Sequence, residues 1–264
     1  MIGFLGLLFL AYCAPLEPLS TGFWTGVVWV LCGIVNAVYP AKLLGIGRRA
    51  HGAWLAAAGV LLCLACVMWP VRPIPAGKTA MLLDSYLAGY DFGERHENVI
   101  KGSPEQVMAS LKAVRVEDIR IWQTLMRIRV MLFGGAPVRR NQPATTAPLL
   151  TLMQQPGSGF LLLEERPFEI VMGMAGRPWA NQGAPGVHDA ETWRAFHEPG
   201  SIRVAFNFRV EDMGRGESRL ITETRIAGTD DEGRSRMARY WRVIYPGSGL
   251  IRREILNAAE ARLH

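Results

Sequence analysis

No cysteine follows residue 66 in this chain of 264 residues. That absence excludes a disulfide framework and a cysteine-ligated metal site for the larger part of the protein. The five histidines have no spacing that would gather them on one metal, and the chain lacks a glycine-rich phosphate loop and a nucleophile elbow. We therefore expect neither a metal nor a cofactor.

Charge is nearly missing from residues 1–69, whose charged side chains are Glu17, Lys42, Arg48 and Arg49. Residues 22–47 contain one stretch, and residues 53–69 a second, that are apolar and long enough to cross roughly 30 Å of hydrocarbon. The pattern predicts three parts, which are a membrane segment over residues 1–72, a linker over residues 73–91 and a soluble domain over residues 92–264.

Residues 1–14 are also apolar but short, so the membrane segment has two or three transmembrane helices. A third span, a half-inserted helix and a signal peptide all stay open, and we favour a retained segment because no basic residue precedes the stretch. The positive-inside rule places the basic loop over residues 42–51 in the cytoplasm. We therefore expect an integral protein of a bacterial inner membrane, with its soluble domain on the extracytoplasmic side.

Two features that suggest other functions have plain explanations. Cys63 and Cys66 have the spacing of a redox or metal pair, but they lie in an apolar stretch without a partner pair, and we interpret them as lipid-facing filler. The net charge of +6 comes from basic residues interleaved with acidic ones, which is typical of a solvated surface. We expect no nucleic-acid partner.

The soluble part carries both strand-like and helix-like patterns. Ser103, Pro104 and Gln106 form a helix start, with a capping serine, a proline at the first helical position and a glutamine that closes the capping box. Strict alternation of apolar and polar residues predicts a half-buried strand over residues 202–210. The expected strands are residues 92–101, 160–165, 168–174, 202–210 and 220–226, and the expected helices are residues 104–114, 117–133, 149–153, 188–196 and 229–264.

The C-terminal helix begins with a recognisable cap. Thr229 and Glu232 fit a capping box, and acidic residues lie against the positive end of the helix dipole. Further along, Pro246 cannot donate a hydrogen bond to the carbonyl of Arg242. We therefore expect a kink or a break at that point.

This order of elements indicates an α+β fold, in which a curved antiparallel sheet grips the long C-terminal helix. Three marks accompany the order: Ser103-Pro104-Glu105 after the first strand, Thr222-Glu223-Thr224-Arg225 in the last strand, and Tyr240-Trp241 in the closing helix. With these marks, residues 92–264 resemble the START-like (SRPBCC) helix-grip superfamily, which includes lipid-transfer domains and polyketide cyclases. The resemblance does not extend to the membrane segment.

The resemblance implies an apolar cavity between the sheet and the C-terminal helix. We expect a membrane-tethered domain that binds an apolar or amphipathic small molecule, such as a lipid, in this cavity, rather than an enzyme. The bilayer and this small molecule are the expected partners. Two alternatives stay open, a cyclase or dehydratase and an interaction module without a ligand. The side chains expected at the ligand are Trp122, Trp179, Phe206, Phe208, Met237, Tyr240 and Trp241.

An enzyme would need a buried ionisable group, for which Glu169 and Glu223 are the candidates. Glu223 lies beside Arg225 on a polar strand face, and Asn207 lies on the neighbouring strand. If this face lines the cavity, Glu223 is placed to bind a headgroup or transfer a proton; if it faces water, the residues form cross-strand salt bridges. We favour the second interpretation, because the phenylalanines over residues 202–210 place the apolar side inward.

Trp179 lies in a stretch rich in glycine and proline, where no secondary structure requires a large side chain. Beside Arg177 it is suited to cap the mouth of a cavity or to enter the bilayer interface. Simple packing is the alternative, and the sequence leaves both open.

Overall fold

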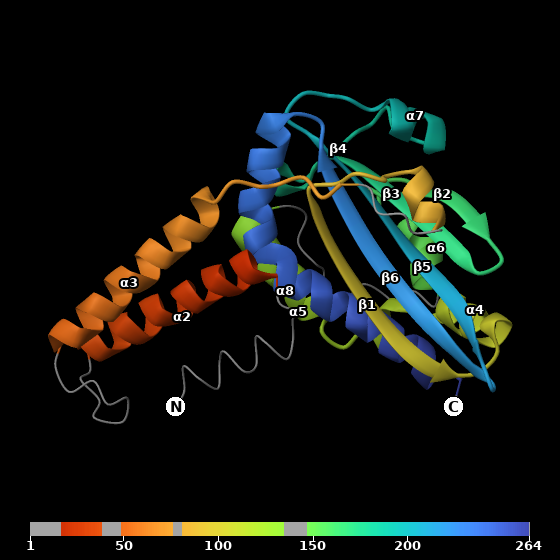
Figure 1. The fold of residues 1–264 in the computed structure, drawn as a ribbon, viewed down its shortest axis with the longest axis horizontal. Coiled ribbons are helices and arrows are strands. Elements are labelled where there is room, and N and C mark those ends of the chain that lie inside the picture. Colours follow the sequence, from red (N-terminus) through yellow and green to blue (C-terminus); the bar gives the residue numbers. More distant parts are fainter. Residues whose placement is uncertain (1–16, 39–48, 76–80, 135–146, 264) are drawn as a thin grey trace. The chain divides into compact units, whose positions relative to one another are not determined.

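The computed structural model describes residues 17–38, 49–75, 81–134 and 147–263. The chain forms two compact units, of which the first contains Met1–Pro70 and Ala238–Gly249, and the second contains Val71–Met237 and Leu250–His264. Helix α8 (Asp231–Ala261) therefore gives its middle part to the first unit and both of its ends to the second (Figure 1).

In the first unit, helices α2 (Pro18–Val38) and α3 (Arg49–Met68) are each long and apolar enough to cross a bilayer. Large apolar side chains such as those of Leu31 and Leu61 are exposed, whereas a helix in a soluble core would bury them. Both helices begin before the predicted stretches. The predicted third segment, residues 1–14, lies outside the described residues.

Helices α2 and α3 pack closely because glycines face each other across the pair. A Cβ atom added at Gly33 would lie 2.6 Å from the carbonyl oxygen of Gly52, and one added at Gly59 would lie 2.6 Å from that of Gly26. Real Cβ atoms do not approach an oxygen so closely, so only glycine fits at these positions. Backbone contact through small residues is how helices associate inside membranes, where apolar side chains gain nothing by leaving lipid.

Cys63 and Cys66 lie at the same helix pair, so their interpretation as lipid-facing filler is wrong. Cys66 is buried, and the Sγ atom of Cys63 donates to the carbonyl oxygen of Phe23 at 3.4 Å. A Cβ atom added at Gly26 would lie 2.6 Å from Cys63 Sγ, and one added at Gly22 would lie 2.8 Å from Cys66 Sγ. The sulfur atoms fill the space that the glycines leave.

Helix α8 continues through Pro246, so a break, one of the two expected outcomes, does not occur. Because proline has no N–H, the carbonyl oxygen of Arg242 loses its partner in the helix. The indole Nε1 of Trp24 donates to this oxygen at 3.1 Å. The guanidinium of Arg242 also lies 3.5 Å from Glu17 Oε1 and 3.4 Å from the carbonyl oxygen of Cys66, so this part of α8 is bound to the helix pair.

Asp230, and not Thr229, caps α8, so the predicted capping box is wrong. Asp230 accepts hydrogen bonds from the N–H groups of Gly233 at 2.7 Å and Gly200 at 2.8 Å, and these bonds lower the pKa of its carboxyl group. The oxygen of the Thr229 hydroxyl accepts instead from the N–H of Ser201 at 3.2 Å, and the hydroxyl donates to the carbonyl oxygen of Glu198 at 2.8 Å. The threonine thus anchors the preceding loop, and the cap falls one residue later.

The second unit is built on a curved, unclosed antiparallel sheet in the order β1-β6-β5-β3-β2, with β4 paired to β3 (Figure 1). This confirms the α+β class and the antiparallel sheet. Strand β1 matches its prediction residue for residue, whereas β4, with only two residues, has no pattern to find. The strands are β1 (Phe92–Lys101), β2 (Leu161–Arg166), β3 (Glu169–Arg177), β4 (Gln182–Gly183), β5 (Ile202–Gly214) and β6 (Glu217–Gly228).

The helices of the second unit are short, apart from the ends of α8. The capping box predicted before α4 is confirmed, since Ser103 Oγ accepts from Gln106 N and Gln106 Oε1 accepts from Ser103 N. The single helix predicted over residues 117–133 is instead a 3₁₀ turn followed by α5, which buries none of its residues. These helices are α4 (Pro104–Ala113), α5 (Trp122–Phe133), α6 (Leu149–Met153) and α7 (Ala190–Ala195), and the 3₁₀ helices are η2 (Leu82–Ser85), η3 (Val116–Asp118) and η4 (Pro178–Ala180).

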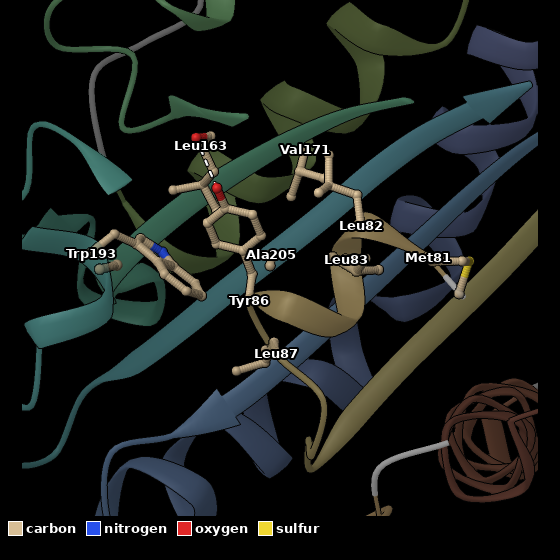
Figure 2. Close-up of a cluster of buried hydrophobic side chains, with 10 residues drawn as sticks. Met81, Leu82, Leu83, Tyr86, Leu87, Leu163, Val171, Trp193 and Ala205 are labelled. Carbon is tan, nitrogen blue, oxygen red and sulfur yellow. Dashed lines mark hydrogen bonds between the residues drawn. The ribbon is translucent and has the colours of Figure 1, made fainter. Parts of the chain in front are cut away.

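Both faces of the central strands are covered. The last part of α8, Leu250–Ala261, lies against the side of β5 that carries Phe206 and Phe208, which we name the α8 face. Residues 81–87, which include η2, cover the opposite side, which we name the η2 face (Figure 2). There the Tyr86 hydroxyl donates to the carbonyl oxygen of Leu163 at 3.1 Å. Polar residues in the middle of the central strands, such as Asn207, Thr222 and Arg225, are therefore buried.

Candidate functional site

Strand β1 places Glu94 and His96 on the α8 face, because alternate residues of a strand point to the same side. The same row begins with Phe92 and ends with Ile100, both of which are buried. Glu94 and His96 are each only 6% exposed. Between these two apolar residues the row carries Glu94, His96 and Asn98, of which Asn98 donates to Asn257 and Glu260 of α8.

The neighbouring strands continue these rows across the sheet. Glu94 is paired with Thr224 on β6 and then Phe206 on β5, and the next row runs through Thr222 and Phe208. The Thr222 hydroxyl donates to the carbonyl oxygen of Asn207 at 2.8 Å. The α8 face thus combines a polar edge at β1 and β6 with an aromatic surface at β5.

Helix α8 adds Arg252 over this surface. Its guanidinium carbon lies 4.0 Å from the centroid of the Phe206 ring and 5.7 Å from that of Phe208, which is the geometry of a cation–π contact. Its Nε atom lies 4.0 Å from Glu94 Oε1, and Glu94 Oε2 lies 4.0 Å from His96 Nε2. Both distances exceed that of a hydrogen bond. We name these three ionisable residues together with Thr224 the β1–α8 cluster.

The charge of Arg252 is poorly compensated. Burial lowers the pKa of Arg252 to about 10, while the nearby carboxylate of Glu94 acts in the opposite direction. The side chain as a whole is 12% exposed. Within the described ranges, its recorded contacts are the distant ion pair with Glu94 and the two phenylalanine rings.

The β1–α8 cluster also contains two polar atoms that have no hydrogen-bond partner among the described residues. Among the residues that the structure describes, His96 Nε2 and Thr224 Oγ1 are buried and make no hydrogen bond. A buried polar atom that loses its hydrogen bond to water without gaining another costs about 1–3 kcal/mol. A bound molecule or an ordered water is able to supply the missing bonds.

The β1–α8 cluster offers several kinds of hydrogen bond beside an aromatic surface. The guanidinium donates, the carboxylate accepts, and the hydroxyl and imidazole do either. Phe206 and Phe208 pack edge to face with their centroids 6.1 Å apart. No group of three or more His, Cys, Asp or Glu side chains gathers in the described part of the chain, so the cluster is suited to an organic molecule with a polar end rather than to a metal ion.

The two residues that we considered for catalysis, Glu169 and Glu223, lie on the η2 face. Glu169 accepts from Asn207 Nδ2 at 2.7 Å and from the backbone N–H of Leu82 at 3.0 Å. Glu223 Oε1 accepts from Arg225 Nε at 2.7 Å. Glu169 therefore bonds the η2 segment to the sheet, whereas Glu223 holds the guanidinium of Arg225 within β6.

Arg225 completes this second network. It donates to Asp84 Oδ1 at 2.7 Å and to the carbonyl oxygen of Leu87 at 3.0 Å. Burial disfavours its charge, but hydrogen bonds to Glu223 and Asp84 outweigh that effect, so the pKa of Arg225 is raised. The Arg225–Glu223 ion pair joins two residues of β6, so it is not the expected cross-strand pair, which Glu223 forms with Arg95 of β1 at 3.6 Å. The Arg225–Glu223 pair does not face water, because residues 81–87 fold over it.

The residues predicted to contact a ligand fall in different parts of the fold. Phe206 and Phe208 lie against the β1–α8 cluster. Met237 is buried at the first end of α8, whereas Tyr240 and Trp241 belong to the part of α8 in the first unit. Trp122 begins α5 and Trp179 lies in η4, so neither residue is part of the sheet.

Glu94, His96 and Arg252 were missed by the reasoning from sequence. The available signal was period-two spacing, which places Glu94 and His96 in one row with two apolar residues of β1. That signal requires knowing which side of β1 is covered. Arg252 had no signal of its own, since arginines are common on helix surfaces.

No protein-family model matches the chain, and no curated protein matches it. Among solved structures, the crystal structure of hypothetical protein jhp0584 from Helicobacter pylori is similar, with a TM-score of 0.35 and 12% identity. The similarity covers 72% of this chain and 99% of that chain. At this level the comparison assigns neither a fold family nor a function, so the functional argument rests on the geometry of the site.

Proposed function

We propose that the second unit binds an amphipathic small molecule on the α8 face, with the polar end of the molecule at the β1–α8 cluster and its apolar part against Phe206 and Phe208. The observation that carries this proposal is that His96 Nε2 and Thr224 Oγ1 are buried without a hydrogen-bond partner among the described residues. A ligand that supplies these bonds recovers their cost, and its apolar part gains roughly 25 cal/mol per Å² removed from water.

A membrane tether is the second part of the proposal. Helices α2 and α3 would anchor the chain in a bacterial inner membrane, with the second unit on the extracytoplasmic side. The length and apolarity of both helices, and the glycines at their contact, support this anchor. An amphipathic ligand partitions into the same bilayer, so a tethered binding unit samples a high local concentration of it.

The helix-grip resemblance stays part of the proposal. The end of α8 lies against a curved antiparallel sheet whose first strand is followed by helical segments and then by the other strands, which supports a START-like arrangement. Ligand binding on the α8 face does not depend on that relationship, since it follows from the side chains of the β1–α8 cluster.

The test is native mass spectrometry of the full-length protein released from membranes in a mild detergent. The full chain is needed because residues 238–249 of α8 belong to the first unit. We expect a retained amphiphile in the unsubstituted protein and its loss in Thr224→Val, which removes the hydroxyl at nearly constant volume.

Thr222→Val is the matched control, because the Thr222 hydroxyl already donates to the carbonyl oxygen of Asn207. This control should keep the bound molecule. Equal retention in both variants would contradict the proposal. A clean ligand-free mass for the unsubstituted protein, together with no thermal shift across a panel of lipids, would favour an interaction module.

Acid–base catalysis is the second candidate function, because the buried carboxylate of Glu94 lies beside the imidazole of His96. In this version the bound molecule would be a substrate of a cyclase or dehydratase. His96→Gln keeps a polar side chain of similar reach, so it should retain the ligand but end turnover. Unchanged conversion of the co-purified molecule in His96→Gln would exclude this candidate.

A further inference from the structure

Helix α5 has an unusual composition for a helix of the second unit. Its sequence, WQTLMRIRVMLF, contains no acidic residue, and apolar side chains are distributed around its whole circumference. A helix that is apolar on all sides is normally enclosed, either in a protein core or in a membrane. Helix α4 shows the ordinary pattern, since it buries Val107 and Leu111 and exposes its polar side.

None of the residues of α5 is buried. Three large apolar side chains at helical spacing are exposed: 42% for Ile128, 76% for Met131 and 51% for Leu132. These residues lie on one side of the helix, because positions three and four apart are neighbours on a helix surface. The exposed side also carries the basic residue Arg127.

The other side of α5 is held in place. The side-chain amide of Asn181 donates to the carbonyl oxygens of Phe133 at 2.9 Å and Gly134 at 3.0 Å, which ties the end of the helix to the η4 loop. Arg129 donates to the carbonyl oxygen of Pro178 at 3.2 Å. The exposed apolar residues therefore belong to an anchored helix rather than to a frayed end.

We propose that the exposed side of α5 lies in the surface of a lipid bilayer that contains anionic headgroups. An interfacial helix of this kind buries its apolar side at the level of the acyl chains and keeps basic residues at the phosphates. Arg127, together with Arg120 just before the helix, supplies that charge, and both side chains are exposed. Helices α2 and α3 of the same chain, as candidate membrane spans, would keep the bilayer within reach.

This inference goes beyond ligand binding and depends only on the proposed tether. It is tested with the full-length protein in vesicles that contain phosphatidylglycerol and a nitroxide-labelled lipid. Met131→Cys carries an environment-sensitive maleimide dye, and we expect its fluorescence to be quenched by roughly twofold or more, as a side chain at the acyl boundary would be. The unsubstituted chain, with its four cysteines, is treated in parallel as the blank.

Met213→Cys is the matched control, since Met213 is 44% exposed at the end of β5 and has no helix to place it in lipid. Weak and equal quenching at both positions would overturn the proposal. Disulfide-linked dimers through Met131→Cys would also overturn it, in favour of a second copy of the chain. The measurement needs no ligand, so its failure leaves the proposed ligand binding on the α8 face intact.

Discussion

The two faces of the sheet each contain a buried arginine, and the two arginines are bound in opposite ways. On the η2 face, Arg225 lies 2.7 Å from both Glu223 and Asp84, and its pKa is raised. On the α8 face, Arg252 lies 4.0 Å from Glu94, and its pKa is lowered. The same residue type is therefore stabilised as a cation on one side of the sheet and destabilised on the other.

The difference indicates what each face is for. A charge whose donors are all satisfied by the protein holds two parts of the chain together, and it offers nothing to a ligand. A charge that the protein leaves poorly satisfied lowers stability, and such a feature is retained where it serves binding or catalysis. We therefore assign a structural role to the η2 face, and the contrast supports our proposal of a binding role for the α8 face.

The largest effect is expected from disrupting the η2 face. The double variant Glu223→Gln/Arg225→Met leaves Asp84 and the carbonyl of Leu87 buried without their cationic partner. It should lower the free energy of unfolding by about 3–5 kcal/mol, the usual cost of breaking a buried ion pair. Urea unfolding of the full-length protein in mild detergent, followed by circular dichroism, measures the change. A loss below about 1 kcal/mol, typical of an exposed pair, would refute the structural role.

The equivalent change on the α8 face should act in the other direction. The double variant Glu94→Gln/Arg252→Met removes a charge whose burial is poorly offset, so we expect the free energy of unfolding to rise by about 1–3 kcal/mol. The same urea titration measures it. Native mass spectrometry of this variant should show no bound amphiphile. Destabilisation as large as that of the η2 variant would remove the contrast between the faces.

The smallest effects sharpen the comparison within one strand. Thr222→Val removes a hydroxyl that donates to the carbonyl oxygen of Asn207 and should cost about 1 kcal/mol. Thr224→Val removes a hydroxyl without a described partner and should be neutral or stabilising in the ligand-free protein. Thermal unfolding of both variants compares them directly. A reversed order of the two midpoints would show that Thr224, and not Thr222, is structurally engaged.

Local patterns predicted much of the fold. Strand β1 and the capping box at Ser103 were correct, because alternation and capping depend on near neighbours in the sequence. The cap of α8 was placed one residue early, since the Thr229 hydroxyl accepts from Ser201 and donates to Glu198, two residues that are distant in the sequence. Of the kink or break predicted at Pro246, the break does not occur, because the helix continues. The indole of Trp24 donates to the carbonyl oxygen of Arg242, which proline leaves without a partner in the helix. Contacts between distant segments decided each error.

The candidate site was harder to predict than the fold. In a strand with one solvent-exposed face, alternation of polar and apolar residues shows which side is buried. A strand that is covered on both faces lacks this signal. Residues 81–87 looked like a linker, and their position over the sheet removed Glu169 and Glu223 from any opening. With Glu169 and Glu223 covered by residues 81–87, Glu94 and His96 on the α8 face became the better candidates for a ligand site. The burial of Phe206 and Phe208 was predictable, because large aromatic residues are buried in most settings.

The hydrogen bond from Trp24 to the carbonyl of Arg242 joins residues separated by 218 positions. During synthesis α2 and α3 leave the ribosome before the sheet, whereas the segment of α8 that they bind is made after it. The first unit is therefore completed only after the sheet has been synthesised. A contact of such high sequence separation makes assembly of the helix pair with α8 a late step of folding.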